Sequence, residues 1–339
     1  MLSNVSTLIE DAAGDIWFGT FGGGLALFDR KNAKIRRFTS QHSEFGQLAS
    51  NTITSISENE KGKIWVGTPE GLHIIEKFSG EVNLIQSSPS LPNSLINNDI
   101  RTIYPDRSGA IWIITSEGIN IYSRLSGRFR KYQRIPGSEH TLLSNKVNCF
   151  AEDKAGNVWI GTQGGLNRFE RYNKRFTSYK LGTATEDNVA GNDIKSLLID
   201  QKGIYWVGTA AGLYKFDPES GTSVIYKVKQ GLQGGLQNEV HTLYQTRTGE
   251  IWVGLRQGLA RFLPDSGVFV IYKPVPGARE NQIINNVYTL LEDRYGKFWV
   301  GTLGGGLFEF DRSKKRFRKY ANEPSDSTSL SHNSVISLH

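Results

Sequence analysis

Tryptophan recurs along this chain at a nearly constant interval. Successive tryptophans are 46 to 48 residues apart, at Trp17, Trp65, Trp112, Trp159, Trp206, Trp252 and Trp299. A sequence period of about 20–50 residues is typical of solenoids, propellers and other repeat architectures. The interval therefore predicts that the 339-residue chain contains seven copies of one small structural unit.

Glycines accompany every tryptophan. One stands three residues before it, and another lies six or seven residues after it, followed by Leu or Ile. The first and last copies, "GDIWFGTFGGGLALFD" (14–29) and "GKFWVGTLGGGLFEFD" (296–311), carry a run of three glycines. A phosphate-binding loop would open a helix, whereas a strand-like segment follows here. We therefore interpret the glycines as turns within the repeat.

Each unit is predicted to contain four short strands. In the first unit they are near "NVSTLIED", "IWFGT", "LALFD" and "KIRRF". β-Branched and aromatic residues favour strands, and no stretch shows a sustained helical period. A four-stranded unit cannot bury both faces alone, but seven units around an axis can. We predict an all-β fold, a seven-bladed β-propeller with four antiparallel strands per blade, in which the tryptophans are structural anchors between blades.

The repeat also predicts where the domain ends. We place the propeller at residues 1–320, with repeats near 1–47, 48–94, 95–141, 142–188, 189–234, 235–281 and 282–328. In the final "STSLSHNSVISLH", Asn333 occupies the repeat position of Asn51, so residues 329–339 are interpreted as the first strand of a truncated further repeat. The alternative is that this segment closes the ring. If residues 329–339 belong to a truncated repeat, deleting the residues after Tyr320 should leave the thermal stability almost unchanged.

The composition argues against several kinds of binding site and active site in this chain. The net charge is +7, but Lys and Arg are spread evenly without a basic block, so we expect no nucleic-acid partner. The single cysteine, Cys149, excludes an intramolecular disulfide, and the six histidines show no metal-ligand spacing. No Gly-x-Ser-x-Gly elbow or Cys/His pairing indicates a nucleophile. We therefore expect no metal, no cofactor and no catalytic residue in this chain.

The combination of Gly, Trp, Gly-Thr and Gly-Leu resembles the two-component regulator propeller repeat. The clearest copy is "NKVNCFAEDKAGNVWIGTQGGLNRFERYNKRFTSY", residues 145–179, and the resemblance extends over essentially the whole chain. It implies a periplasmic sensor region of a bacterial signalling protein. In the parent chain such a region is joined to a second propeller and to a histidine kinase or diguanylate cyclase. The expected partners are a small-molecule ligand, often an oligosaccharide, and a second copy of the parent in a homodimer.

Two positions in each first strand vary while the rest of the repeat is strict. The residue between them is always Val or Ile, so alternation places both variable side chains on the other face. Such variation is expected if these residues bind a ligand that lacks the symmetry of the repeat. The alternative is that they are solvated channel residues that pair with one another. The candidates at the channel mouth are Asp99, Arg101, Lys146, Asn148, Asp193, Lys195, Glu239, His241 and Tyr288.

A second candidate set lies on the loop face. The loops from fourth to first strand are long and variable, and binding residues are common on such loops. The candidates here are Phe45, His140 and Arg279, together with Arg256 from a shorter loop. Two other functions remain open. One is a propeller enzyme of the sialidase or streptogramin-lyase type, with Glu139, His140 and His241 as possible acid/base groups, and the other is a protein-interaction scaffold.

Overall fold

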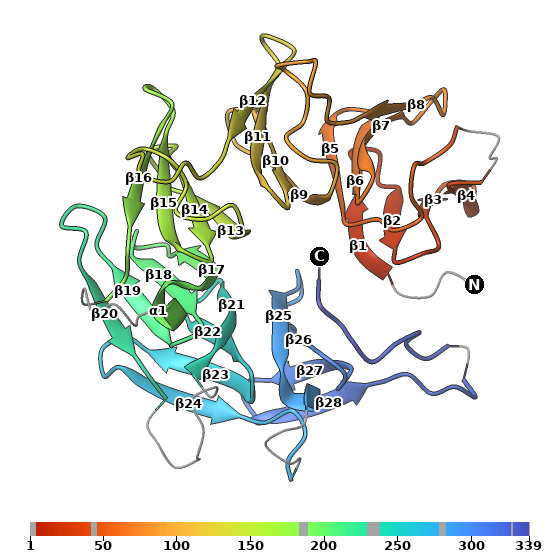
Figure 1. The fold of residues 1–339 in the computed structure, drawn as a ribbon. Coiled ribbons are helices and arrows are strands. Elements are labelled where there is room, and N and C mark those ends of the chain that lie inside the picture. Colours follow the sequence, from red (N-terminus) through yellow and green to blue (C-terminus); the bar gives the residue numbers. More distant parts are fainter. Residues whose placement is uncertain are drawn as a thin grey trace. The chain divides into compact units, whose positions relative to one another are not determined.

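The computed structural model describes residues 5–41, 46–182, 189–228, 238–277, 283–326 and 328–338. In these ranges the strands form seven antiparallel sheets, each made of four strands consecutive in sequence (Figure 1). The chain is therefore an all-β, seven-bladed β-propeller, as predicted. The described ranges contain little helix: the α-helical turn α1 (Val189–Asn192) and the 3-10 turn η2 (Ile283–Asn285) are two short examples. No described helix is long and apolar enough to cross a membrane.

The described chain divides into two compact units, and the first ends at Gly137. It contains three blades. Blade 1 consists of β1 (Val5–Glu10), β2 (Ile16–Thr20), β3 (Leu25–Asp29) and β4 (Lys34–Phe38). Blade 2 consists of β5 (Ser55–Glu60), β6 (Lys63–Thr68), β7 (Gly71–Glu76) and β8 (Val82–Ile85). Blade 3 consists of β9 (Ile100–Pro105), β10 (Ile111–Thr115), β11 (Gly118–Ser123) and β12 (Arg128–Tyr132).

The second unit begins at Ser138 and contains four blades. Blade 4 consists of β13 (Val147–Glu152), β14 (Val158–Thr162), β15 (Gly165–Glu170) and β16 (Arg175–Tyr179). Blade 5 consists of β17 (Ile194–Ile199), β18 (Tyr205–Thr209), β19 (Leu213–Phe216) and β20 (Ser223–Tyr226). Blade 6 consists of β21 (Val240–Gln245), β22 (Ile251–Leu255), β23 (Gly258–Leu263) and β24 (Val268–Tyr272). Blade 7 consists of β25 (Val287–Glu292), β26 (Phe298–Thr302), β27 (Leu307–Asp311) and β28 (Arg316–Tyr320).

Five of the tryptophans lie in hydrophobic cores between consecutive blades of a unit: Trp17, Trp65, Trp159, Trp206 and Trp252. Trp17 is fully buried and packs with Ile53 of blade 2. Trp159 packs with Ile194 and Phe216 of blade 5, and its ring centroid lies 5.7 Å from that of Phe216 in an edge-to-face contact. A buried aromatic side chain of this size removes about 200 Å² from water. The regular tryptophan spacing thus reflects one anchor per blade.

An aspartate in the turn between the first two strands holds the tryptophan ring. In five blades the Trp Nε1–H donates to a carboxylate oxygen of this Asp at 2.7–3.0 Å; the acceptors are Asp11, Asp106, Asp153, Asp200 and Asp293. The other oxygen of the same carboxylate accepts backbone N–H groups of the turn, at 2.9 Å from Lys202 and Ile204 in the case of Asp200. The repeated Asp thus pairs polar groups that would otherwise be buried without partners.

The Gly-Thr pair after the tryptophan has two structural roles. A Cβ added to Gly208 would come within 2.5 Å of Val240 in the next blade, so glycine is required for the blades to approach this closely. The Thr209 hydroxyl donates to the Gly212 carbonyl at 3.0 Å across the turn into β19. Glycine therefore serves the packing between blades, and threonine stabilises the hairpin within a blade.

An asparagine before the first strand secures the linker from the preceding blade. Its side-chain oxygen accepts a backbone N–H from a residue 10 or 11 positions earlier, at 2.6–2.8 Å; the acceptors are Asn51, Asn98, Asn192, Asn238, Asn285 and Asn333. The same bond at Asn333 shows that the chain after β28 follows the course of a linker between blades.

The segment 328–338 is attached to blade 7. The Asn333 carbonyl accepts the Gly306 N–H at 2.8 Å, and the Val335 N–H donates to the Thr302 carbonyl at 2.8 Å. Val335 also packs against Gly301, as the first residue of a following blade does elsewhere in the unit. Within this segment the pairing with blade 7 is a single bridge between Leu303 and Ser334. That the segment opens a further repeat remains a prediction.

Candidate functional site

The variable position of the first strand is the extra residue of a β-bulge. In six sheets the register between the first two strands skips one residue, and the skipped residues are Ser6, Arg101, Asn148, Lys195, His241 and Tyr288. A bulge residue leaves the hydrogen-bonded ladder, and its side chain is re-aimed. The sequence predicts that side chains of the first strand alternate between the two faces of the sheet. This alternation is interrupted at the bulge residue, which is the position that varies most in residue type.

Some bulge side chains simply join one blade to the next. The Ser6 hydroxyl donates to the Ile53 carbonyl at 2.5 Å, and the Asn148 amide donates to the Ile194 carbonyl at 2.7 Å. Thr54 makes the equivalent bond to the Ile100 carbonyl at 2.6 Å. These contacts support a structural role at the small or amide-bearing positions. The larger side chains are the ones that could also contact a ligand.

In the second unit the first strands β13, β17, β21 and β25 follow one another on the inner side of the blades (Figure 1). Seven of their residues and loop neighbours form what we call the mouth cluster: Asn148, Asp193, Lys195, Glu239, His241, Arg256 and Tyr288. The His241 and Tyr288 rings stack with centroids 4.5 Å apart and an interplanar angle of 18°. They form a flat aromatic pair between blades 6 and 7.

Ion pairs hold the charged members of the mouth cluster. Lys195 Nζ lies 2.7 Å from Asp193 Oδ2, and Arg256 Nη1 lies 3.3 Å from Glu239 Oε2. The Asn148 amide reaches Asp193 at 3.4 Å across blades 4 and 5. The cluster therefore presents donors and acceptors in fixed pairs, while each of these side chains keeps some exposure to solvent.

The environment of His241 favours the neutral form of its imidazole. Burial lowers its pKa below the usual range, the Glu239 carboxylate opposes this, and the charges of Lys195 and Arg256 add to it. Its Nε2 is buried and has no hydrogen-bond partner within the described residues. A neutral imidazole stacked on Tyr288 provides an aromatic surface and not an additional cation.

The other predicted site residues are placed differently. Arg101 pairs with Asp99 at 2.7 Å in the first unit, with its side chain 61% exposed. Lys146 is exposed beside the mouth cluster's Asn148 on β13. Exposed His140 approaches the Phe176 carbonyl of the outermost strand β16 at 3.4 Å, so it belongs to the blade rim.

Two predicted residues, Phe45 and Arg279, lie outside the described ranges. The proposed acid/base groups of an enzyme are also separated, because His140 contacts an outermost strand whereas His241 lies on the innermost strand β21. Of the loop set, Arg256 joins the mouth cluster through Glu239, and which of the predicted residues bind a ligand remains a prediction.

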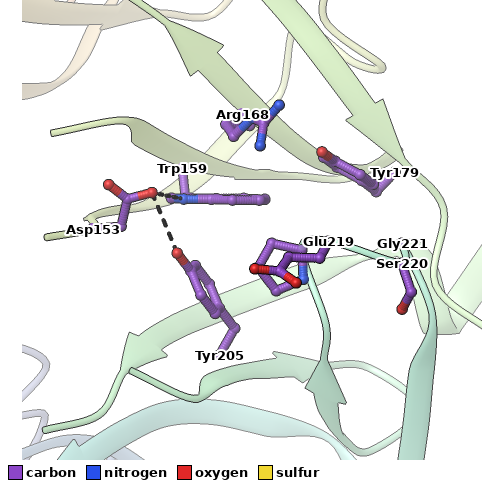
Figure 2. A pocket seen from close by; sticks show the side chains of 9 residues that line it. Asp153, Trp159, Arg168, Tyr179, Tyr205, Glu219, Ser220 and Gly221 are labelled. Atoms are coloured by element: carbon purple, nitrogen blue, oxygen red, sulfur yellow. Dashed lines mark hydrogen bonds between the residues drawn. The ribbon is translucent and has the colours of Figure 1, made fainter. Parts of the chain in front are cut away.

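A pocket between blades 4 and 5 was not predicted from the sequence. It has a volume of about 500 Å³, and it is lined by Asp153, Trp159, Arg168, Tyr179, Tyr205, Pro218, Glu219, Ser220 and Gly221 (Figure 2). Of the lining residues, the sequence predicts a role only for Trp159, as a structural anchor between blades. The available signal was Tyr205, because the residue before the tryptophan is Ile, Val or Phe in the other six repeats.

The repeats match the family described as "Two component regulator propeller". The matched segments are residues 2–22, 47–70, 94–117, 141–164 and 281–304, which fall in blades 1, 2, 3, 4 and 7. A curated relative, histidine kinase P4 of Formosa agariphila, is 28% identical over 60 residues, which are 18% of this chain and 4% of that protein.

A solved structure from B. thetaiotaomicron shares the fold, and the comparison with solved structures also gives a second match from that organism. The extracellular domain of the proposed hybrid two-component system BT3049 has a TM-score of 0.57 and 19% identity, covering 93% of this chain and 51% of the other. The extracellular domain of the proposed one-component system BT4673 has a TM-score of 0.47 and 20% identity, covering 96% of this chain and 49% of the other. The chain thus spans about half the length of these extracellular domains.

Proposed function

We propose that this chain, a propeller built from repeats of the two-component regulator propeller family, is the ligand-binding sensor region of a bacterial signalling protein. The family match and the fold shared with an extracellular domain of a hybrid two-component system support this assignment. In the parent chain a second propeller and downstream signalling domains would transmit the signal, and the parent would act as a homodimer. The same resemblance supports a periplasmic location.

One structural observation supports a particular binding site. The position that changes chemical type from repeat to repeat is the bulge position, and bulges often re-aim side chains next to functional sites. Lys195, His241 and Tyr288 occupy three successive bulges of the second unit. A rigid scaffold that varies only at such positions favours a binding surface without repeat symmetry.

The chemistry of the mouth cluster suits an oligosaccharide. The stacked His241 and Tyr288 rings offer a flat surface for the apolar face of a sugar ring. Around it, Lys195 with Asp193 and Arg256 with Glu239 supply charged donors and acceptors for hydroxyl groups. Binding sites combine apolar rings with a few placed polar groups in this way. The proposed role is recognition and not catalysis.

The test is a thermal-shift screen of the purified chain against a panel of defined oligosaccharides. A ligand that binds only the folded state at about 100 times its Kd adds about 2.7 kcal/mol of stability, which corresponds to a rise in Tm of several degrees. We expect one oligosaccharide class to produce this rise, and we expect Lys195→Ala and His241→Ala to abolish it.

A matched control keeps the result specific. Lys297→Gln removes an exposed lysine that is ion-paired with Glu309 at 3.0 Å in the outer part of blade 7. This variant should respond to the oligosaccharide as the unaltered chain does. If the Tm rises equally in the two mouth-cluster variants, the site lies elsewhere. If no oligosaccharide shifts the Tm, the interaction-scaffold function gains support instead.

A further inference from the structure

One side of the pocket between blades 4 and 5 departs from the commonest form of the repeat. The repeat position just beyond the third strand is basic in five blades, at Arg30, Lys77, Arg124, Arg171 and Arg312, but it is proline in blades 5 and 6, at Pro218 and Pro264. In blade 2 the equivalent Lys77 reaches back to Asp11 at 2.6 Å and Asp15 at 2.8 Å, so its ammonium group occupies this space. Pro218 has no charged group that could fill the corresponding space between blades 4 and 5, where a hollow of about 500 Å³ lies.

The inner wall of the pocket is rigid. Asp153 accepts hydrogen bonds from Trp159 Nε1 at 2.9 Å and from the Tyr205 hydroxyl at 3.3 Å (Figure 2). Burial raises the pKa of Asp153, but the hydrogen bonds from Trp159, Asn157 and Tyr205 outweigh it and lower the pKa overall. Burial and this carboxylate raise the pKa of Tyr205 to about 12. Both aromatic side chains are therefore fixed, and the phenol stays protonated.

One side of the pocket carries two donors for an acid group, the Arg168 guanidinium and the Tyr179 hydroxyl. Arg168 Nη2 lies 2.8 Å from Glu170 Oε1, while Nη1 has no hydrogen-bond partner within the described chain. The Arg168 guanidinium carbon lies 5.8 Å from the Trp159 ring centroid. The Tyr179 hydroxyl also lacks a partner among the described residues, and burial raises its pKa, so it remains a donor. An incoming carboxylate would accept from both groups.

The other side of the pocket carries a negative charge. Glu219 lies on the exposed turn between β19 and β20, and no cation of the described ranges forms an ion pair with it. In the view of Figure 2, Arg168 and Glu219 lie on opposite sides of the Trp159 ring plane, and the Tyr179 ring stacks on Trp159 with centroids 5.7 Å apart. The lining thus places opposite charges on two sides of an aromatic surface.

We propose that this pocket binds a small zwitterion of the α-amino acid class with an apolar side chain. The carboxylate would bind Arg168 and Tyr179, the ammonium group would bind Glu219, and the side chain would contact the aromatic rings and Pro218. Hydrogen bonds between charged partners are stronger than those to neutral hydroxyls, so the paired charges favour a zwitterion over a polyol. A volume of about 500 Å³ is within the usual range for small-ligand pockets. This site is separate from the mouth cluster.

The test is isothermal titration calorimetry of the whole chain with L-phenylalanine. We expect saturable binding, and we expect 3-phenylpropionate, which lacks the ammonium group, and phenethylamine, which lacks the carboxylate, to bind about tenfold more weakly or worse. Glu219→Gln should lower the affinity for L-phenylalanine by a similar factor, and so should Arg168→Gln. Lys195→Ala, in the mouth cluster, should not change it.

The matched control is Asp265→Asn, because Asp265 occupies the turn position of Glu219 in the next blade and does not line this pocket. It should bind L-phenylalanine like the unaltered chain. Arg168→Gln also removes the Glu170 ion pair, so Glu219→Gln on its exposed turn decides the question if Arg168→Gln does not fold. Absence of saturable binding, equal binding of 3-phenylpropionate, or unchanged affinity in Glu219→Gln would each overturn the proposal.

Discussion

A buried histidine in blade 2 should make the stability of the fold depend on pH. His73 is fully buried on β7, and its Nε2 accepts the Ala49 N–H at 2.8 Å. The same register position holds Asn120 and Asn167 in blades 3 and 4, where the amide oxygens accept the corresponding loop N–H groups at 3.0 and 3.3 Å. His73 thus acts as a neutral acceptor in a position where asparagine also works.

The magnitude follows from the pKa of His73. Burial lowers it from 6.5 to about 4, and the nearby Val66 backbone opposes this only in part. Between these values the unfolded chain binds a proton that the folded chain does not, so stability is lost as the pH falls through this window. Above pH 6.5 there is no penalty. At pH 5 the penalty is about 2 kcal/mol, and it approaches about 3 kcal/mol well below pH 4.

The assay is urea unfolding followed by tryptophan fluorescence at pH 7.5, 6 and 5, for the unaltered chain and for His73→Asn. The substitution costs some packing at every pH, but the difference in unfolding free energy between the two proteins should shift by about 2 kcal/mol in favour of the variant from pH 7.5 to 5. His140→Asn, at an exposed histidine, is the matched control. Parallel pH curves for the unaltered chain and His73→Asn would refute the reasoning.

Three further predictions concern the repeat scaffold, and urea unfolding measures each of them. Asp200→Ala leaves the buried Trp206 N–H and the backbone N–H groups of the turn without their partner. This substitution should lower the free energy of unfolding by about 2–4 kcal/mol. If the exposed control Asp265→Ala lowers it by a similar amount, the turn bonds contribute little. Gly208→Ala forces a Cβ against Ser196 and Val240 and should cost about 1–3 kcal/mol; an unchanged midpoint would mean that the blades separate easily. Removing the residues after Tyr320 breaks the bonds of Asn333 and Val335 to blade 7. The structure therefore predicts that the free energy of unfolding falls by about 1–3 kcal/mol. Unchanged stability would support the sequence-based prediction that this segment belongs to a truncated repeat.

Much of the fold was predictable because the repeat is encoded locally. The tryptophan interval, the strand-like segments and the glycine turns identify seven four-stranded blades without any tertiary information. The structural roles of the turn aspartate and of Gly-Thr also follow from their recurrence, because a ligand site would not need them in nearly every copy. The hydrogen bond from Trp159 to Asp153, which is repeated in other blades, is an example.

The mouth cluster could be predicted only in part. The sequence identifies Lys195, His241 and Tyr288 as variable, but it does not show that they are bulge residues, since a bulge depends on how one strand pairs with its neighbour. It also does not show that His241 stacks on Tyr288, because these rings come from different blades. Residues 47 positions apart meet only when the blades pack.

The sequence by itself determined the architecture, because one short pattern of turns, strands and a buried ring is repeated along the whole chain. The tertiary structure decided where that scaffold leaves room for a ligand. The pocket between blades 4 and 5 depends on Tyr205, Pro218 and Asp153, which lie on two blades and are unremarkable one at a time. Local sequence sets the form of each blade, whereas the space between blades depends on which side chains meet there.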